Sequence, residues 1–167
     1  MNSHPADGAG LTLNPEEADA VAAAASGYAA ALPPDRAAPY HALAQAAADG
    51  VIPDDLVDAA ERVAAVSLQT GRARRDGQAG DESLLAAVYR RTPAGQVLTG
   101  RAREVNQALE ALTGRQLRTA RVTTLAPGSY TLTLGTDGVV VTLSIDTAGI
   151  EVRSLQEYHE SEQLPLA

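Results

Sequence analysis

Hydrophobic and polar residues alternate along the last third of the chain, between residues 118 and 155. The apolar positions recur at every second residue within short runs: Tyr130, Leu132, Leu134, Val139, Val141, Leu143, Ile145, Ile150 and Val152. The positions between them are mainly hydroxyl-bearing or charged. A period of two residues is typical of strands with one buried face and one solvent-facing face. The pattern therefore predicts an antiparallel four-stranded β-meander over residues 118–155.

Turn signals indicate how the expected strands pair. Asp137-Gly138 is a strong hairpin signal, because such turns need residues that tolerate a positive φ. An even loop there, and another at Thr147-Ala148, would place apolar residues opposite one another: Leu134 with Val141, Leu132 with Leu143, and Ile145 with Ile150.

The first turn, Ala126-Pro127-Gly128, allows two registers. A two-residue loop would turn Arg121 toward the apolar face. A three-residue loop pairs Val122 with Leu132 and leaves Arg121 outside. We favour the three-residue loop because burying an unpaired arginine is costly.

The first two thirds of the chain show a different period, in which apolar residues recur every three or four positions. This spacing is typical of amphipathic helices, and prolines, glycines and capping residues separate the segments. Four or five helices are expected in residues 13–114: about 15–31, 35 or 38 to 49, 54–70, 81–91 and 93–113. Pro39 fits the second helix only if it lies in the first turn.

The longest expected helix, residues 93–113, carries a continuous apolar seam. Thr92-Pro93 supplies its cap and first residue, and Gly114 ends it. The seam residues follow at spacings of four and three: Leu98, Ala102, Val105, Leu109 and Leu112. Because this helix directly precedes the meander, we expect its seam to lie across the apolar face. The predicted fold class is α+β, with N-terminal helices followed by a four-stranded antiparallel β-meander packed on the long helix.

A single domain is expected over residues 13–156, with a helical part (13–114) and the meander (118–155). A chain of 167 residues is long enough to bury a core without disulfides or metal. Residues 1–12 show no periodicity and are expected to be disordered, and residues 157–167 form an acidic tail. The glycine- and arginine-rich residues 71–80 are expected to form a flexible loop.

The composition excludes several kinds of chemistry. The chain has no cysteine, which excludes disulfides and thiolate catalysis. All thirteen basic residues are arginine, which excludes a P-loop lysine and a Schiff base. The abundance of alanine and arginine is typical of a bacterial chain from a GC-rich genome. No membrane span is expected, and the acidic residues before the apolar stretch 18–32 are unlike a signal peptide, so we expect a cytoplasmic protein.

The net charge of −8 is unevenly distributed. Residues 1–61 hold ten acidic residues and one arginine, residues 62–121 hold eleven arginines and five acidic residues, and residues 122–167 hold one arginine and six acidic residues. The basic middle either pairs with its acidic flanks, which we favour, or binds an anion.

The second reading of the basic middle makes a nucleic-acid-binding regulator an alternative hypothesis for the chain. Its candidate residues form the arginine-rich segment 72–103: Arg72, Arg74, Arg75, Arg90, Arg91, Arg101 and Arg103. The order of a short helix, a turn, a longer helix and strands could form a winged helix-turn-helix. However, the would-be recognition helix carries a seam that we expect in the core, and the protein is acidic.

No catalytic, cofactor or metal site is predicted. His4, His41 and His159 lie far apart, and none belongs to a His-Glu-x-x-His pattern. The carboxylates at the start of the third helix are most simply a solvated helix face, favoured there by the helix dipole: Asp54, Asp55, Asp58 and Glu61. We expect no cofactor and favour a non-enzyme, and a small-ligand-binding protein or an enzyme of unknown class is a further alternative.

The solvent-facing side of the meander is weakly charged and rich in hydroxyl groups. Its candidate interaction residues are Thr131, Thr133, Val140, Thr142, Ser144, Glu151 and Arg153. Such a face is either ordinary surface or a docking face for a second copy or an incoming strand. Our leading hypothesis is a non-enzymatic protein-interaction module, such as a regulator, adaptor or chaperone-like factor. It would act through the sheet face or edge, as a homodimer.

Overall fold

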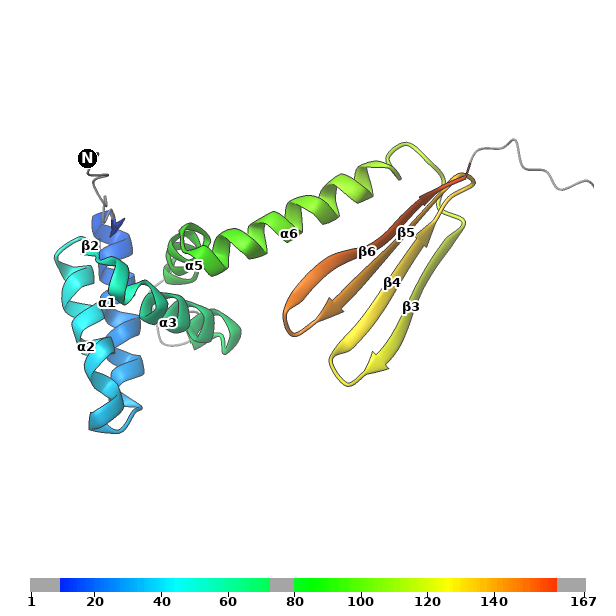
Figure 1. Ribbon diagram of the computed structural model, residues 1–167. Coiled ribbons are helices and arrows are strands. Elements are labelled where there is room, and N and C mark those ends of the chain that lie inside the picture. Colours follow the sequence, from blue (N-terminus) through cyan, green and yellow to red (C-terminus); the bar gives the residue numbers. More distant parts are fainter. Residues whose placement is uncertain (1–9, 73–79, 159–167) are drawn as a thin grey trace, which may run out of the picture. The chain divides into compact units, whose positions relative to one another are not determined.

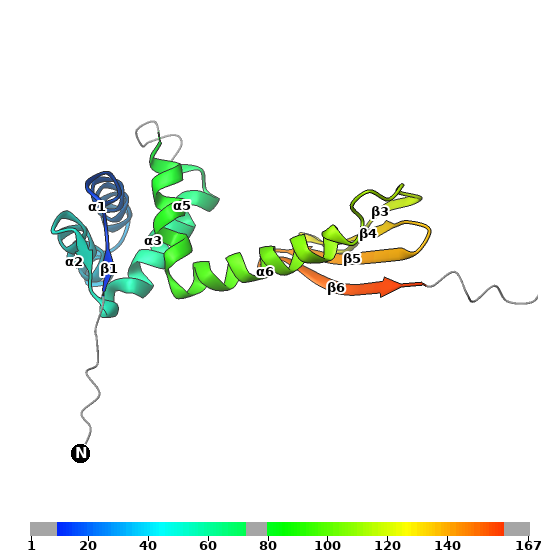
Figure 2. The ribbon, with the colours of Figure 1, turned by 90° about the horizontal axis from the view of Figure 1, so that it is seen from above.

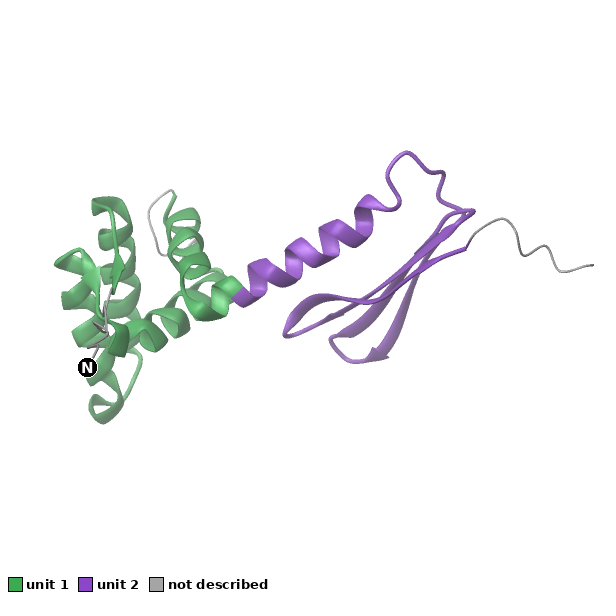
Figure 3. Cartoon of the chain, turned by 45° about the horizontal axis from the view of Figure 1, so that its top comes forward, with its two compact units in different colours: residues 1–96 green, residues 97–167 purple. Residues whose placement is uncertain are grey.

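The structure is a computed structural model that describes residues 10–72 and 80–158. The chain divides into two compact units, residues 1–96 and residues 97–167 (Figure 3). The described part of unit 1 is mainly helical, and unit 2 contains the four-stranded sheet. Helix α6, Pro93–Glu110, contributes its first residues to unit 1 and the remainder to unit 2.

Unit 1 begins with a helical hairpin. Helix α1 spans Pro15–Ala30 and packs along α2, which spans Pro34–Ala48 (Figure 1). Asn14 and Glu17 form a capping box, in which each side chain accepts a hydrogen bond from the other residue's backbone N–H. The expectation that Pro39 lies in a first turn was wrong, because α2 begins at Pro34 and continues through Pro39. The packing of α2 on α1 offsets the hydrogen bond that proline cannot donate.

A two-stranded antiparallel sheet connects the start of the described chain to the segment after α2. Strand β1, Leu11–Thr12, pairs with β2, Val51–Ile52. Residues 11 and 12 were expected in a disordered N-terminus, and backbone pairing holds them instead. Strands of two residues are too short to show an alternating pattern in the sequence. The rest of that expected segment, residues 1–9, lies outside the described residues.

Helix α3 is central to unit 1. It spans Val57–Gln69 after the short 3-10 helix η1, Asp54–Leu56, and it packs against α1, α2 and α5, Asp81–Arg91. The core of unit 1 contains many alanines, and its largest fully buried side chains are Leu43, Ile52, Val63, Leu85 and Val88. Of the expected flexible loop 71–80, residues 73–79 lie outside the described part of the chain.

Two carboxylates hold the corner between α5 and α6. Glu61 of α3 accepts a hydrogen bond from the backbone N–H of Ala94 at 2.7 Å. Glu17 of α1 forms an ion pair with Arg91 at 2.7 Å. Glu61 was expected on a solvated helix face; it instead satisfies one of the N–H groups that the start of a helix leaves unpaired. Thr92, buried at this corner, begins α6 as the sequence predicted.

The sheet of unit 2 has four strands in sequence order: β3 (Thr119–Ala126), β4 (Ser129–Gly135), β5 (Val139–Asp146) and β6 (Gly149–Glu157) (Figure 2). The predicted pairs are confirmed: Val122 with Leu132, Leu134 with Val141, Leu132 with Leu143, and Ile145 with Ile150. The predicted α+β fold with a C-terminal meander is therefore confirmed. That residues 13–156 fold as one domain stays a prediction.

Helix α6 packs on the apolar face of this sheet. Val105 and Ala108 of α6 form the core of unit 2 with three residues of β5: Val139, Val141 and Leu143. The predicted seam is confirmed only in its second half. Leu109 and Leu112 are partly buried in this core, whereas Leu98 and Ala102 are exposed.

Candidate interaction surfaces of the C-terminal sheet

The hydroxyl-rich face lies on the side of the sheet opposite α6. Strand pairing aligns Thr123, Thr131, Ser144 and Glu151 in one row across the four strands. A second row contains Arg121, Thr133, Thr142 and Ser154, and Val140 lies in a third. Six of the seven candidate interaction residues therefore share one face. The seventh, Arg153, occupies a bulge in β6 where the register with β5 shifts.

This face is polar without being strongly charged. The Ser144 hydroxyl donates to Glu151 Oε1 at 3.1 Å. Thr131 is buried, and its hydroxyl is the one buried side-chain polar atom of the described residues that has no hydrogen-bond partner. The face can accept hydrogen bonds from a docking protein, but its role as an interaction site stays a prediction.

The apolar face of the sheet is covered on one side only. One cross-strand row contains Val122, Leu132, Leu143 and Val152, in the order β3 to β6. Leu143, beneath α6, is 1% exposed, whereas Val122 at the β3 end of the same row is 63% exposed. A helix is about 10–12 Å wide and strands lie about 4.8 Å apart, so one helix covers about two strands. Strand β3 has no such cover within unit 2, whereas Leu132 of β4 packs partly against the core beneath α6.

Uncovered apolar side chains lie on α6, β3 and β4, and Leu155 of β6, which is 43% exposed, lies farther from the β5–β6 turn. We define the open apolar patch as Leu98 of α6, Val122 and Leu125 of β3, and Tyr130 of β4, all at least 40% exposed. A Cβ on Gly149 would lie 3.1 Å from Leu98 Cδ1, which places Leu98 beside the β5–β6 turn. A Cβ on Gly128 would lie 3.9 Å from Thr147, so the β3–β4 and β5–β6 turns are neighbours. Leu98 and Tyr130 thus lie toward the turn end of the sheet, and Val122 and Leu125 lie on the uncovered strand β3, where the register with β4 shifts at Leu125. Sequence reasoning missed these exposed residues because it assigned the whole face to the helix.

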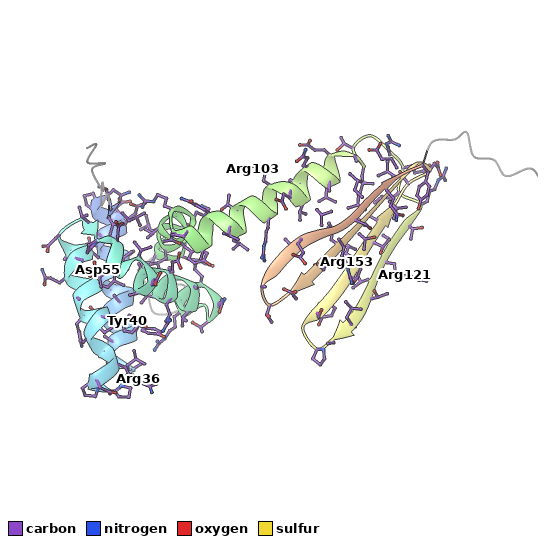
Figure 4. The ribbon with its side chains drawn as sticks, in the orientation of Figure 1. Arg36, Tyr40, Asp55, Arg103, Arg121 and Arg153 are labelled. Atoms are coloured by element: carbon purple, nitrogen blue, oxygen red, sulfur yellow. The ribbon has the colours of Figure 1, made fainter. Side chains whose placement is uncertain are left out.

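The two edge strands differ in how they are protected against further pairing. Strand β6 carries Glu151, Arg153 and Glu157 and a bulge at Arg153. Charges and bulges are the devices by which sheets discourage pairing at an edge. All eight residues of β3 are exposed, and Arg121 is the only charged one (Figure 4 labels Arg121 and Arg153). The open apolar patch therefore adjoins the less protected edge.

The candidate arginines do not form one described cluster. Arg72, Arg90 and Arg91 belong to unit 1, Arg101 and Arg103 belong to unit 2, and Arg74 and Arg75 lie outside the described residues. Arg91 is engaged by Glu17 and also donates to the Thr12 carbonyl at 2.9 Å. Arg101 donates to the Ala148 carbonyl at 3.4 Å. These contacts agree with the interpretation that the basic middle of the chain makes contacts within the protein.

An ion pair connects the start of β3 to the β4–β5 turn. Arg118 binds Asp137 with two hydrogen bonds, Nε to Oδ1 at 2.8 Å and Nη2 to Oδ2 at 2.9 Å. The hydrogen bond from Arg118, and then its positive charge, lower the pKa of the Asp137 carboxyl against an opposing effect of desolvation. The same hydrogen bond raises the pKa of Arg118. Both side chains are exposed, so salt screens the attraction.

Neither a metal centre nor a membrane segment is found in the described residues. Over residues 10–72 and 80–158, no group of three or more histidine and acidic side chains could hold a metal ion. None of the helices described there is both long and apolar enough to cross a bilayer. His41 is an exposed residue of α2, and His4 and His159 lie outside the described residues.

Comparison with known proteins gives no relative for this chain: no family model, no curated protein and no solved structure matches it. Its function has to be inferred from its own residues.

Proposed function

We propose that this chain is a non-enzymatic protein-interaction module of the cytoplasm, a regulator, adaptor or chaperone-like factor, which acts through its C-terminal sheet. The observation that supports this function is the open apolar patch. Val122 is 63% exposed although it lies in the same apolar row as Leu143, which is 1% exposed. Apolar side chains grouped on a surface mark sites where another molecule binds.

Burial of this patch would stabilise a complex. Full burial of a Val or Leu side chain contributes roughly 1.5–3 kcal/mol. A partner that buries the exposed half of such a side chain would therefore gain about half of that free energy. The adjoining edge strand β3 offers unpaired backbone groups in addition, and an incoming strand can hydrogen-bond to them. The arginine-rich segment and a small-ligand pocket are supported by no comparable feature of the described residues.

Affinity capture from an extract of the native host tests this function. The bait is the full chain, compared with Val122→Glu on the apolar face, Thr133→Glu on the hydroxyl-rich face, and Gln45→Glu on the exposed side of α2 as control. A specific partner should be captured equally by the wild type and the control, and about tenfold less by at least one sheet variant, which corresponds to roughly 1.4 kcal/mol. Equal capture by all four baits, or loss with Gln45→Glu alone, would contradict a function of the sheet.

A further inference from the structure

We propose that the free edge of strand β3 binds an extended acidic segment of a partner protein, which adds to the sheet as a further strand beside β3. This inference rests on the proposed function, because it names the kind of partner that the same sheet would bind and the way it would bind. It assigns the contact to the backbone of β3 rather than to either face of the sheet.

The hydrogen bonds of β4 determine which backbone groups of β3 are directed outward. In an antiparallel sheet, successive residues of an inner strand bond alternately to one neighbouring strand and to the other. The Thr136 N–H donates to the Val139 carbonyl at 2.8 Å, so the even-numbered residues of β4 bond to β5. The Gly135 carbonyl accepts from the backbone N–H of Arg118 at 2.8 Å, so the odd-numbered residues of β4 bond to β3.

Strand β3 is therefore left with a regular row of outward backbone groups. It is the outermost strand of the described sheet, and its residues opposite odd-numbered residues of β4 are Arg121 and Thr123. The residues that alternate with them direct their N–H and C=O groups away from β4: Ala120, Val122 and Thr124. Another extended polypeptide repeats donors and acceptors at the same spacing, so the occupant that fits this edge is a strand.

Local charge selects an acidic strand. The chain has a net charge of −8, but residues 111–136, which include β3 and β4, contain three arginines and no acidic residue. Of these arginines, Arg118 is paired with Asp137, and Arg121 lies exposed in the middle of β3. An acidic residue on the incoming strand would pair with Arg121 across the edge. The alternate residues of that strand would lie beside Val122, so they should be apolar.

A second copy of β3 fits this edge less well. The antiparallel register that bonds all three outward residues of each copy is centred on Val122. It places the Arg121 side chains of the two copies diagonally beside each other on one face, where like charges repel. Strand β3 has no acidic residue that could pair with them. A partner segment that supplies the carboxylate removes this repulsion.

Binding of a designed peptide to the full chain tests the proposal. The probe is a fluorescent peptide of about seven residues, an ordinary strand length, in which valine alternates with glutamate. Two further versions carry N-methyl groups on alternate amides, one on the valines and one on the glutamates. Because only every second amide of an added strand faces β3, one methylated version should bind at least about tenfold more weakly and the other within about twofold of the probe. Fluorescence anisotropy measures all three.

Variants of the chain test the same contact from the other side. Val122→Pro removes an outward N–H and leaves the hydrogen bonds between β3 and β4 in place, so it should weaken peptide binding at least about tenfold. Leu155→Pro is the matched control on the opposite edge. The Tyr158 N–H donates to Gly138, so even-numbered residues at this end of β6 bond to β5 and the N–H of residue 155 also points outward. Leu155→Pro should change binding less than about twofold.

Charge is tested with Arg121→Glu and with a peptide in which lysine replaces glutamate. Arg121→Glu should weaken binding of the acidic peptide and strengthen binding of the lysine peptide, because it reverses the only charge on β3. Circular dichroism should show unchanged secondary structure for the folded variants. If Val122→Pro does not fold, the methylated peptides and Arg121→Glu still decide the outcome.

Several results would overturn an acidic strand at this edge. They are no binding of the acidic peptide, equal weakening by both methylation patterns, equal effects of Val122→Pro and Leu155→Pro, and stronger binding of the lysine peptide to the wild type. A dimer in sedimentation equilibrium that Val122→Pro dissociates would assign the edge to a second copy instead. The broader function survives any of these failures if host partners are still lost from a sheet variant in the capture experiment, and falls only when that capture is also unaffected.

Discussion

The two halves of the apolar face of the C-terminal sheet are built from similar residues and differ in what lies above them. On β5, Val141 and Leu143 are packed beneath Val105 and Ala108 of α6. On β3, Val122 belongs to the same row as Leu143 and is mostly exposed. Residue type and alternation are therefore not enough to determine burial. The number of strands relative to the number of covering helices decides it, and a single helix is too narrow for four strands.

The largest expected difference is between a leucine beneath α6 and an exposed leucine of β3, where the register with β4 shifts. Leu143→Ala should lower the free energy of unfolding by about 2–5 kcal/mol, because it leaves a cavity under α6. Leu125→Ala, at a residue that is 60% exposed, should change it by less than about 0.5 kcal/mol. Urea unfolding followed by circular dichroism measures both values. Similar losses for the two variants would mean that Leu125 is also buried in solution.

A smaller difference is expected along α6 itself. Val105→Ala removes two buried methyl groups from the contact with the sheet and should cost about 2 kcal/mol. Val97→Ala, one of the exposed positions on the same helix, should leave stability within about 0.5 kcal/mol of the wild type. The same unfolding experiment compares them. An effect of Val97→Ala as large as that of Val105→Ala would show that the exposed side of α6 is buried in solution.

The smallest effect on stability is expected at the ion pair between Arg118, just before β3, and Asp137 in the β4–β5 turn. Because Arg118 lowers the pKa of Asp137, the pair stabilises the fold above the unfolded-state pKa of about 3.9, and this contribution disappears as the pH falls through the lower, folded-state pKa. Asp137→Asn should therefore be slightly less stable than the wild type at neutral pH and equally stable in strong acid. Thermal melts between neutral and acidic pH measure the difference. A difference in melting temperature between the wild type and Asp137→Asn that grows as the pH falls would contradict a stabilising role of this ion pair.

The sequence predicted the parts of the fold that depend on local patterns. Alternation was enough for the strand register, including the choice of Val122 opposite Leu132, which followed from keeping Arg121 out of the apolar face. The three-residue loop expected at the first turn was wrong, because Ala126 pairs with Ser129 and a register shift at Leu125 produces the same pairing of Val122. Capping residues also allowed the start of α1 to be predicted, and Asn14 and Glu17 form a capping box there. These features involve neighbouring residues or a single hairpin, so the residues that determine them lie close together in the sequence.

The parts that were missed depend on residues far apart in the sequence. The pairing of Leu11 with Ile52, and the hydrogen bond from Ala94 to Glu61, leave no periodic signal. The open apolar patch was missed for another reason. Leu98 and Leu109 have the same place in the helical pattern, but only the second is packed in the core of unit 2. Which half of an apolar face is covered follows from the width and position of the helix.

The reactivity of single thiols tests the central claim most directly, because the chain has no cysteine of its own. Val141→Cys, Val122→Cys and Thr123→Cys place one thiol beneath α6, in the open apolar patch and on the hydroxyl-rich face, respectively. Labelling should be slow at residue 141 and fast at residues 122 and 123. Labelling at residue 122 as slow as at residue 141 would contradict an apolar face that α6 covers only in part.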